Sequence, residues 1–378
     1  MPTLREILQD YTDGLRSEEF RRLFDRDAAN AYEALTRDQE SPEPRDQVTR
    51  LLHRARRLFF GISAKLTPAR RALFGIALFC LVWGLVEPVL STRWGGKEGF
   101  AITIDASPLP YLAGFFCVAF LLTLELVDKL RVRDELEVAR QLQKDLLPHH
   151  DLALPGYQFA HSYRTAEVVG GDYYDVYPLP DGRFALVVGD ASGHGMAAGL
   201  VMAIANATIR TALDIEPTCQ KVQELLNRSL CRAGDRRTYM TLFFAFLEPE
   251  NGRLEYFGAA HPFPLLRRAD GTLLELGRGS LPLGLKDPLP FHCEELRLEP
   301  GDRLLLYTDG LPEALDPAGQ AFGYERLRAL FAASGTAREV HDRILAAFDQ
   351  HCQGETLRDD LSLLVVDRTI PPPPPSAA

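Results

Sequence analysis

Four aspartates are the side chains of this chain best suited to chemistry. Each is placed at the end of an apolar run that is typical of a β-strand. Because carboxylates at strand ends can converge at one rim of a sheet, we expect a site of hard oxygen ligands for Mg²⁺ or Mn²⁺. Such a site suits metal-assisted hydrolysis of a phosphate ester. The four are Asp172 in Val-Gly-Gly-Asp-Tyr-Tyr-Asp, Asp190 in Gly-Asp-Ala-Ser-Gly-His-Gly, Asp309 in Tyr-Thr-Asp-Gly-Leu-Pro-Glu-Ala and Asp359 in Asp-Asp-Leu-Ser.

Length, charge and cysteine content narrow the class of protein. A chain of 378 residues exceeds one typical domain and predicts two or three folded units. A formal net charge of −10 argues against nucleic acid as the main partner, because phosphate backbones need a basic face. The cysteines form no Cys-x-x-Cys pair. We therefore expect them to behave as ordinary apolar residues in a reducing compartment, and we expect no cysteine-ligated zinc site. They are Cys80, Cys117, Cys219, Cys231, Cys293 and Cys352.

Two apolar runs, 72–90 and 109–127, are each long enough to cross the hydrocarbon layer of a bilayer as a helix. A pair of buried core helices is the alternative. Residues 50–71 are rich in Lys and Arg, and basic residues also follow the second run, whereas few lie between the runs. The positive-inside rule therefore predicts a multi-pass protein of the inner (cytoplasmic) membrane, with both termini in the cytoplasm.

The remaining segments organise the chain around these runs. The stretch 128–148 lacks Gly and Pro and keeps an approximate 4–3 apolar spacing, which predicts a connector helix. That helix either forms a coiled-coil-like homodimer or packs on its own domain as a spacer. The other expected segments are a helical cytoplasmic segment at 1–46, a basic juxtamembrane stretch at 47–71, an external loop at 91–108, a catalytic domain at 149–368 and a Pro-rich tail at 369–378.

The catalytic domain alternates short β-prone runs with a few helical patterns. This order predicts an α+β layered sandwich rather than a doubly wound parallel sheet. Helices are expected at about 196–213, 219–232, 324–333 and 337–350. Strands are expected at Tyr157–Tyr163, Phe184–Val188, Tyr239–Leu247, Arg253–Phe257, Pro264–Arg267, Phe291–Leu298, Asp302–Tyr307 and Leu361–Val366.

The four aspartate motifs, in this order, resemble those of the PPM-type metal-dependent Ser/Thr protein phosphatases. The bacterial SpoIIE-type branch of sporulation and stress regulators is the most similar, over roughly residues 130–368. The resemblance implies a four-layer α-β-β-α sandwich that binds two divalent cations, Mn²⁺ or Mg²⁺, at one edge of the paired sheets. It implies that water activated by both metals attacks the phosphorus atom, with no side-chain nucleophile.

The resemblance also implies roles for individual residues. Asp190 would bridge both cations, and the implied metal ligands are Asp172, Asp190, the backbone carbonyl of Ala191, Asp309 and Asp359. Asp360 is expected to support these ligands from behind, and Asp175 either does so or is a solvated charge at a strand end. His194 would either cap the following helix or act on the phosphate as a catalytic residue. His261 is expected to be a turn residue rather than a ligand. Glu313 and the loop 311–322 are expected to form part of a regulatory or substrate-facing segment.

The expected function is that of a membrane-anchored protein Ser/Thr phosphatase. Its expected partners are the lipid bilayer and a phosphorylated cytoplasmic regulatory protein; by resemblance this is an anti-sigma-factor antagonist in partner switching. Two alternatives stay open. One is a non-catalytic membrane receptor or scaffold that retains the phosphatase fold, and the other is a hydrolase of small phosphoesters.

Overall fold

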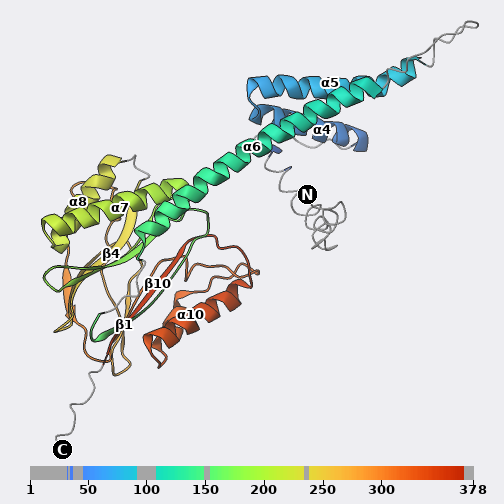
Figure 1. Cartoon of the computed structure of the whole chain (residues 1–378). Helices are drawn as coiled ribbons and strands as arrows, with labels where there is room; N and C mark the ends of the chain where they lie inside the picture. The colour runs from blue at the N-terminus through green and yellow to red at the C-terminus, as the bar shows by residue number, and fades with distance from the viewer. Residues whose placement is uncertain are drawn as a thin grey trace, which may run out of the picture. The chain divides into compact units, whose positions relative to one another are not determined.

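The computed structural model describes residues 32, 35–36, 46–91, 108–148, 154–233 and 238–369 (Figure 1). The chain divides into two compact units, Met1–Arg131 and Val132–Ala378. Most of the expected N-terminal segment 1–46, nearly all of the expected external loop 91–108 and the Pro-rich tail lie outside the described residues.

The first unit contains α4 (Gln47–Lys65), α5 (Pro68–Ser91) and the beginning of α6 (Pro108–Leu146). Asp46 caps α4, because its carboxylate accepts a hydrogen bond from the backbone N–H of Thr49 (3.2 Å). The basic stretch that follows residue 46 is therefore largely helical. The expected second apolar run and the connector are one continuous helix of 39 residues, α6.

Helices α5 and α6 pack antiparallel through small residues. A Cβ added to Gly84 would lie 2.9 Å from the ring of Tyr111, and one added to Gly114 would lie 3.1 Å from the carbonyl oxygen of Ala77. Near the other end of the pair, Arg70 of α5 contacts Glu125 (2.8 Å) and Asp128 (2.6 Å) of α6. Glycine lets the two helices approach closely, as in helix pairs within membranes.

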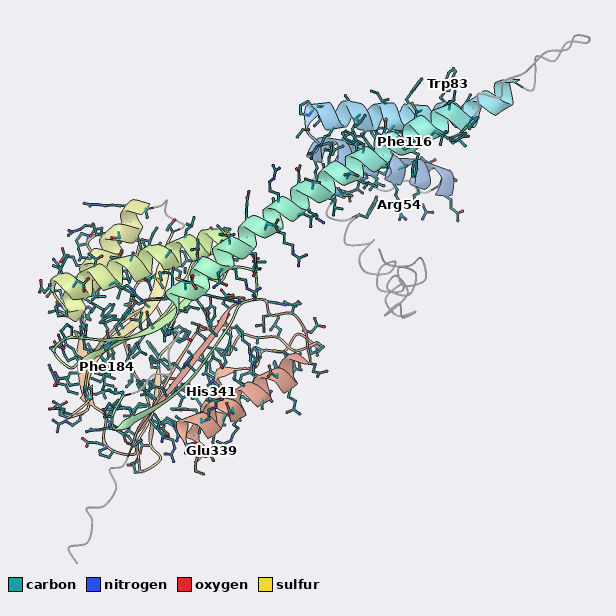
Figure 2. All side chains as sticks on the ribbon, viewed as in Figure 1. Arg54, Trp83, Phe116, Phe184, Glu339 and His341 are labelled. Atoms are coloured by element: carbon teal, nitrogen blue, oxygen red, sulfur yellow. The ribbon has the colours of Figure 1, made fainter. Side chains whose placement is uncertain are left out.

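Large apolar side chains cover the outside of this helix pair. Phe79, Phe115 and Leu122 are each about two-thirds exposed, and Figure 2 shows Trp83 and Phe116 on the same pair. By length and composition, three helical stretches are apolar enough to cross a membrane: Pro68–Val86, one within α6, and Gly195–Ile215. The last of these packs on a sheet in the second unit, and its Met202 and Ala205 are fully buried.

The second unit is built on two five-stranded sheets in which every pairing is antiparallel. Sheet I has the order β2-β3-β4-β5-β8 and sheet II the order β1-β10-β9-β6-β7. The strands of sheet I are β2 (Asp172–Pro178), β3 (Phe184–Ala191), β4 (Met240–Glu248), β5 (Arg253–Ala259) and β8 (Glu294–Arg297). Those of sheet II are β1 (Tyr157–Arg164), β6 (Leu265–Arg267), β7 (Leu273–Glu275), β9 (Arg303–Tyr307) and β10 (Leu361–Arg368).

Helices cover the outer face of each sheet. Figure 1 shows α7 (Gly195–Ile215) and α8 (Cys219–Ala233) on one side and α10 (Ala337–Cys352) on the other, where α9 (Tyr324–Ala332) also packs. Strand β9 shows why the core has two parts. Its Leu304 and Leu306 face the core shared with sheet I, whereas Leu305 and Tyr307 face the core under α9 and α10. The predicted α-β-β-α sandwich is confirmed.

Hydrogen bonds from α10 fix it on sheet II. Thr336 and Glu339 form a capping box at its first turn, so the backbone donors there are satisfied. His341, which is buried, lies 2.9 Å from the hydroxyl of Ser162 on β1. Figure 2 labels both Glu339 and His341 on this helix.

The expected helices and most expected strands lie where the structure has them, with three differences. Asp172 begins a strand instead of ending one, because residues 166–169 form a bend and the two glycines that follow belong to no strand. Strand β7 was not predicted, since three residues carry too little pattern. The expected strand Phe291–Leu298 is reduced to β8 at the sheet edge.

Candidate functional site

All four aspartates lie at one edge of the paired sheets. In sheet I, β2 begins where its antiparallel neighbour β3 ends, so Asp172 stands directly opposite Asp190. In sheet II, β9 ends at Tyr307 and its neighbour β10 begins at Leu361. Asp309 and Asp359 each lie two residues beyond these strand ends. Antiparallel pairing therefore brings together residues that are far apart in the sequence.

Asp172 ties the two sheets together. Its carboxylate oxygen Oδ2 accepts hydrogen bonds from the hydroxyls of Thr308 (2.7 Å), the residue that follows β9, and Ser362 of β10 (2.8 Å). The residue is 1% exposed, so both hydroxyls supply interactions that water cannot. Burial, followed by the charge of Asp190, raises the pKa of Asp172 well above its ordinary value, and the two hydroxyls oppose that rise.

Asp190 is surrounded by other acids. Burial and then the charges of Asp309, Asp359 and Asp360 raise the pKa of Asp190 to about 8. Burial also raises the pKa of Asp309, with a contribution from Glu313. The pKa of Asp359, at the rim, is raised by partial desolvation and then by Asp309. Every charged neighbour that shifts the pKa of Asp190 is an acid, so repulsion between carboxylates dominates the electrostatics at this position.

Glycine makes this crowded edge possible at two positions. A Cβ at Gly171 would lie 2.9 Å from the carbonyl oxygen of Ala191 and 3.2 Å from Asp190 Oδ1. A Cβ at Gly310 would overlap the carbonyl oxygen of Asp360. The motif glycines are therefore required for the close approach of backbone to backbone.

Asp360 supports the edge from behind. Its Oδ1 accepts a hydrogen bond from the backbone N–H of Ala166 (2.8 Å), and its Oδ2 accepts one from Gly171. The carboxylate thus holds the loop that leads into Asp172.

Asp175 lies on the opposite face of β2 from Asp172, because side chains alternate along a strand and the two residues are three apart. It is 4% exposed and lies 3.5 Å from Arg210 of α7. The expectation of a solvated charge is therefore wrong, and the structure does not place Asp175 among the clustered acids.

His194 is the N-cap residue of α7, but its side chain makes no capping hydrogen bond. The imidazole is 85% exposed, and its Nδ1 lies 3.0 Å from Glu167 Oε1. Its positive form lowers the pKa of Asp359, which places it near the rim of the acid cluster.

A cavity of about 340 Å³ opens beside Asp309. His261, Glu313 and Tyr324 contribute to its wall. His261 is 6% exposed; its Nδ1 lies 2.9 Å from the hydroxyl of Thr241, while its Nε2 has no hydrogen-bond partner among the described residues. Burial lowers the pKa of His261 to about 3, so the ring is neutral at physiological pH. The sequence indicated only a turn residue here.

Gln143, near the end of α6, holds the glycines before Asp172. Its side-chain amide donates to the carbonyl oxygen of Gly170 (2.5 Å) and accepts from the N–H of Gly170 (2.9 Å). Gln143 is buried, whereas the neighbouring Leu142 is 62% exposed. The apolar spacing of 128–148 left open which of these two residues lies on the helix seam, and sequence reasoning missed this contact, as it missed the hydroxyls of Thr308 and Ser362.

The donor atoms fit hard divalent cations. Carboxylate oxygens with a nearby backbone carbonyl are the ligands that Mg²⁺ and Mn²⁺ prefer. No three of the four aspartates bring carboxylate oxygens within 4.8 Å of one another among the described residues. Unneutralised carboxylates repel, so a cation between them would both draw them together and relieve the raised pKa values.

Known proteins share both the sequence and the fold of this unit. The family model described as "Stage II sporulation protein E (SpoIIE)" matches residues 180–369. Protein IcfG of Synechocystis is 27% identical over 264 residues, which are 62% of this chain and 42% of IcfG. Phosphoserine phosphatase RsbP of Bacillus subtilis is 26% identical over 243 residues, 63% of this chain and 59% of RsbP. The chain thus spans about half the length of these two relatives.

A solved structure, the SiaA-PP2C domain of Pseudomonas aeruginosa, covers 64% of this chain and 99% of its own length. It superposes with a TM-score of 0.56 at 22% sequence identity. This likeness shows that the second unit has the PP2C phosphatase fold, which is the fold that the PPM-type resemblance implies.

Proposed function

The chain belongs to the stage II sporulation protein E (SpoIIE) family, and on that basis we propose that it is a metal-dependent protein Ser/Thr phosphatase. The observation that carries this proposal is the acid cluster around Asp190 at the shared edge of the two sheets. The raised pKa values there are caused by burial and by other acids. Such an arrangement is costly without cations and is suited to holding them.

The residues that would hold the cations are those of the four motifs. Asp190 raises the pKa of Asp172, and its own pKa is raised by Asp309 and Asp359, so it is the candidate for a ligand shared by two cations. Asp309, Asp359 and the backbone carbonyl of Ala191 complete the proposed set. Because Oδ2 of Asp172 already accepts two hydroxyl donors, Oδ1 is the oxygen left for a cation. Bound divalent cations supply an activated water and neutralise phosphoryl oxygens.

The protein's own groups would keep this chemistry in place. Thr308 and Ser362 orient Asp172, and Asp360 holds the loop that carries it, so the ligands are fixed before substrate binds. The cavity beside Asp309 offers a neutral imidazole and the phenol of Tyr324 to groups that flank the phosphate. His194 is exposed at the rim and is a second candidate to touch the phosphate.

The proposed substrate is a phosphorylated cytoplasmic regulatory protein. RsbP is named a phosphoserine phosphatase, and the SpoIIE-type resemblance points to an anti-sigma-factor antagonist in partner switching. The wide opening of the site favours a protein segment over a small phosphoester, because the rim residues Asp359, His194 and Glu313 are exposed.

We further propose that α5 and the first part of α6 form a transmembrane hairpin in the inner membrane. Their close antiparallel packing and the exposed apolar side chains around them support it. The basic residues of α4 and those after the second span would then face the cytoplasm together with the second unit. Val132, Val138 and Leu142 are exposed on α6 and are available to a homodimer through residues 128–148.

One experiment tests the enzymatic proposal. The full chain in detergent micelles is assayed on a phosphoserine peptide, a phosphothreonine peptide and p-nitrophenyl phosphate, with Mn²⁺ and with EDTA. Asp190→Asn removes the shared ligand, and Asp270→Asn, in an exposed turn, is the matched control. We expect metal-dependent turnover of phosphopeptide that is lost in Asp190→Asn and kept in Asp270→Asn. Absence of turnover would favour the scaffold, and turnover of p-nitrophenyl phosphate alone would favour a hydrolase of small phosphoesters.

A further inference from the structure

One face of α8 holds a long connection between the two sheets. Residues 276–293 join β7 to β8 and contain no helix or strand, only a single bridge between Leu283 and Met240. Gln223 of α8 donates to the carbonyl oxygen of Pro290 (3.1 Å). One turn further on, Asn227 donates to the carbonyl oxygen of Lys286 (2.9 Å) and accepts from the N–H of Gly284 (2.9 Å). Both side chains are buried, so these hydrogen bonds fix the connection on the helix.

Cys219 is the third member of this face. It precedes Gln223 by four residues, the spacing that aligns side chains along a helix. Cys219 is fully buried and meets Cys293, the last residue of the same connection, together with Glu255 of β5. The thiol of Cys293 donates to Glu255 Oε1 (3.4 Å), and that of Cys219 donates to the backbone carbonyl oxygen of Glu255 (3.7 Å). The contacts at this position are therefore weak compared with those of Gln223 and Asn227.

The geometry of this cluster is that of a thiophilic metal site. One ligand atom from each of Cys219, Glu255 and Cys293 lies within 4.8 Å of the other two, and no other group among the described residues does so. A zinc ion with Zn–S of about 2.3 Å places its sulfur ligands about 3.8 Å apart, so small side-chain movements would complete the site. Two thiolates and a carboxylate favour zinc, whereas an all-oxygen set favours Mg²⁺ or Mn²⁺.

We propose that Cys219, Glu255 and Cys293 bind one zinc ion that fastens the 276–293 connection to the start of α8. Cys293 and Glu255 are partly exposed, so solvent can supply a fourth ligand and the ion has a path of entry. A disulfide between the two cysteines is the competing outcome. A disulfide would leave the carboxylate of Glu255 without a function in the cluster. The full burial of Cys219 also keeps oxidants from one of the two sulfur atoms.

The zinc site lies well away from the acid cluster, so its role is structural. Asp190 pairs with Thr241 of β4, whereas Glu255 pairs with Phe246 of the same strand. Five residues along a strand correspond to about 17 Å. Zinc here would stabilise the corner formed by α8, β5 and β8 without taking part in phosphate chemistry. The proposal consequently stands or fails independently of the phosphatase activity.

Cobalt substitution in the full chain tests the site directly. Purified protein in detergent micelles is treated with chelator under reducing conditions and titrated with Co²⁺. We expect about one equivalent to produce a thiolate-to-cobalt charge-transfer band in the near ultraviolet, which carboxylate ligands alone cannot give. Zinc should displace the band. Cys293→Ser is the main variant because Cys293 is only partly buried, and Cys231→Ser, a cysteine of α8 outside the cluster, is the matched control.

Thermal unfolding of the second unit gives a readout that needs no spectroscopic metal. Zinc at about a hundredfold excess over its Kd should raise the unfolding midpoint of the wild type and of Cys231→Ser by roughly 5–10 °C more than that of Cys293→Ser, in which only the acid cluster remains to bind it. Cys219→Ser should behave like Cys293→Ser if it folds. The proposal is overturned by the absence of a thiolate band, by an equal band in Cys293→Ser, or by a Cys219–Cys293 disulfide in protein alkylated at cell lysis.

Discussion

Replacing Asp190 with asparagine should stabilise the second unit when no divalent cation is present. The pKa of Asp190 is about 8 instead of the ordinary 3.8, because burial and neighbouring acids disfavour its charged form. That difference corresponds to about 6 kcal/mol of unfolding free energy as an upper value, since side chains can move apart when charged. A neutral amide removes this cost while keeping nearly the same shape.

The sign of the pH dependence follows from the raised pKa. Below about pH 4 the folded and unfolded chains both hold the proton, and Asp190 makes no difference to stability. Between about pH 4 and pH 8 the unfolded chain loses the proton and the folded chain keeps it, so the free energy of unfolding falls as pH rises. Above about pH 8 the full penalty is present.

The assay is urea unfolding of the full chain followed by pulse proteolysis of the second unit. Tryptophan fluorescence would not report this unit, because both tryptophans, Trp83 and Trp94, belong to the first one. In EDTA the urea concentration at the unfolding midpoint of the wild type should decrease as the pH is raised from 5 to 8. Asp190→Asn should be the more stable protein at pH 8. With Mn²⁺ the order should reverse. Asp270→Asn should follow the wild type throughout.

Two results would refute this reasoning. One is a metal-free stability that stays level or rises between pH 5 and pH 8. The other is an Asp190→Asn protein that is less stable than the wild type at pH 8 in EDTA. Either result would mean that the acids at this edge do not repel one another in the folded chain.

Three further predictions concern single positions. Thr308→Val leaves buried Asp172 one donor short and should cost about 1–3 kcal/mol in urea unfolding, whereas Thr308→Ser should cost much less; equal losses would contradict the hydrogen-bond account. His261→Ala should raise KM for a phosphopeptide more than it lowers kcat, and it should leave the pH–rate profile unchanged near pH 6.5 because the ring is already neutral; loss of a limb there would contradict this. A reporter fused after Thr92 should appear outside the cytoplasm, and a cytoplasmic signal would overturn the proposed hairpin.

The order of elements and the acid edge were predictable because they depend on local patterns. Alternating apolar runs fixed most strands of the sandwich, and the four aspartate motifs each lie beside a chain turn at the end or start of a strand. The position of Asp172 was harder, because the glycines before it look like the end of a strand. Only antiparallel pairing with β3 shows that a strand start and a strand end share one edge.

Other features depend on contacts between distant segments, which a single sequence does not encode locally. Asp175 is buried because it lies inside β2, whereas a strand that ended at Asp172 would leave it in the following turn. The buried, neutral His261 depends on Thr241 and on the cavity beside Asp309. Cys219 and Cys293 are too far apart in sequence to form a recognisable motif, yet α8 and β5 bring them together.

A structure determined from the full chain with Mn²⁺, using the anomalous scattering of manganese, tests the central claim most directly. We expect two manganese peaks at the shared edge of the two sheets, both within bonding distance of Asp190. Asp309 and Asp359 should be ligands of one of these two ions. Manganese located elsewhere, or no ordered manganese at millimolar concentration, would contradict the claim that these aspartates form a catalytic metal centre.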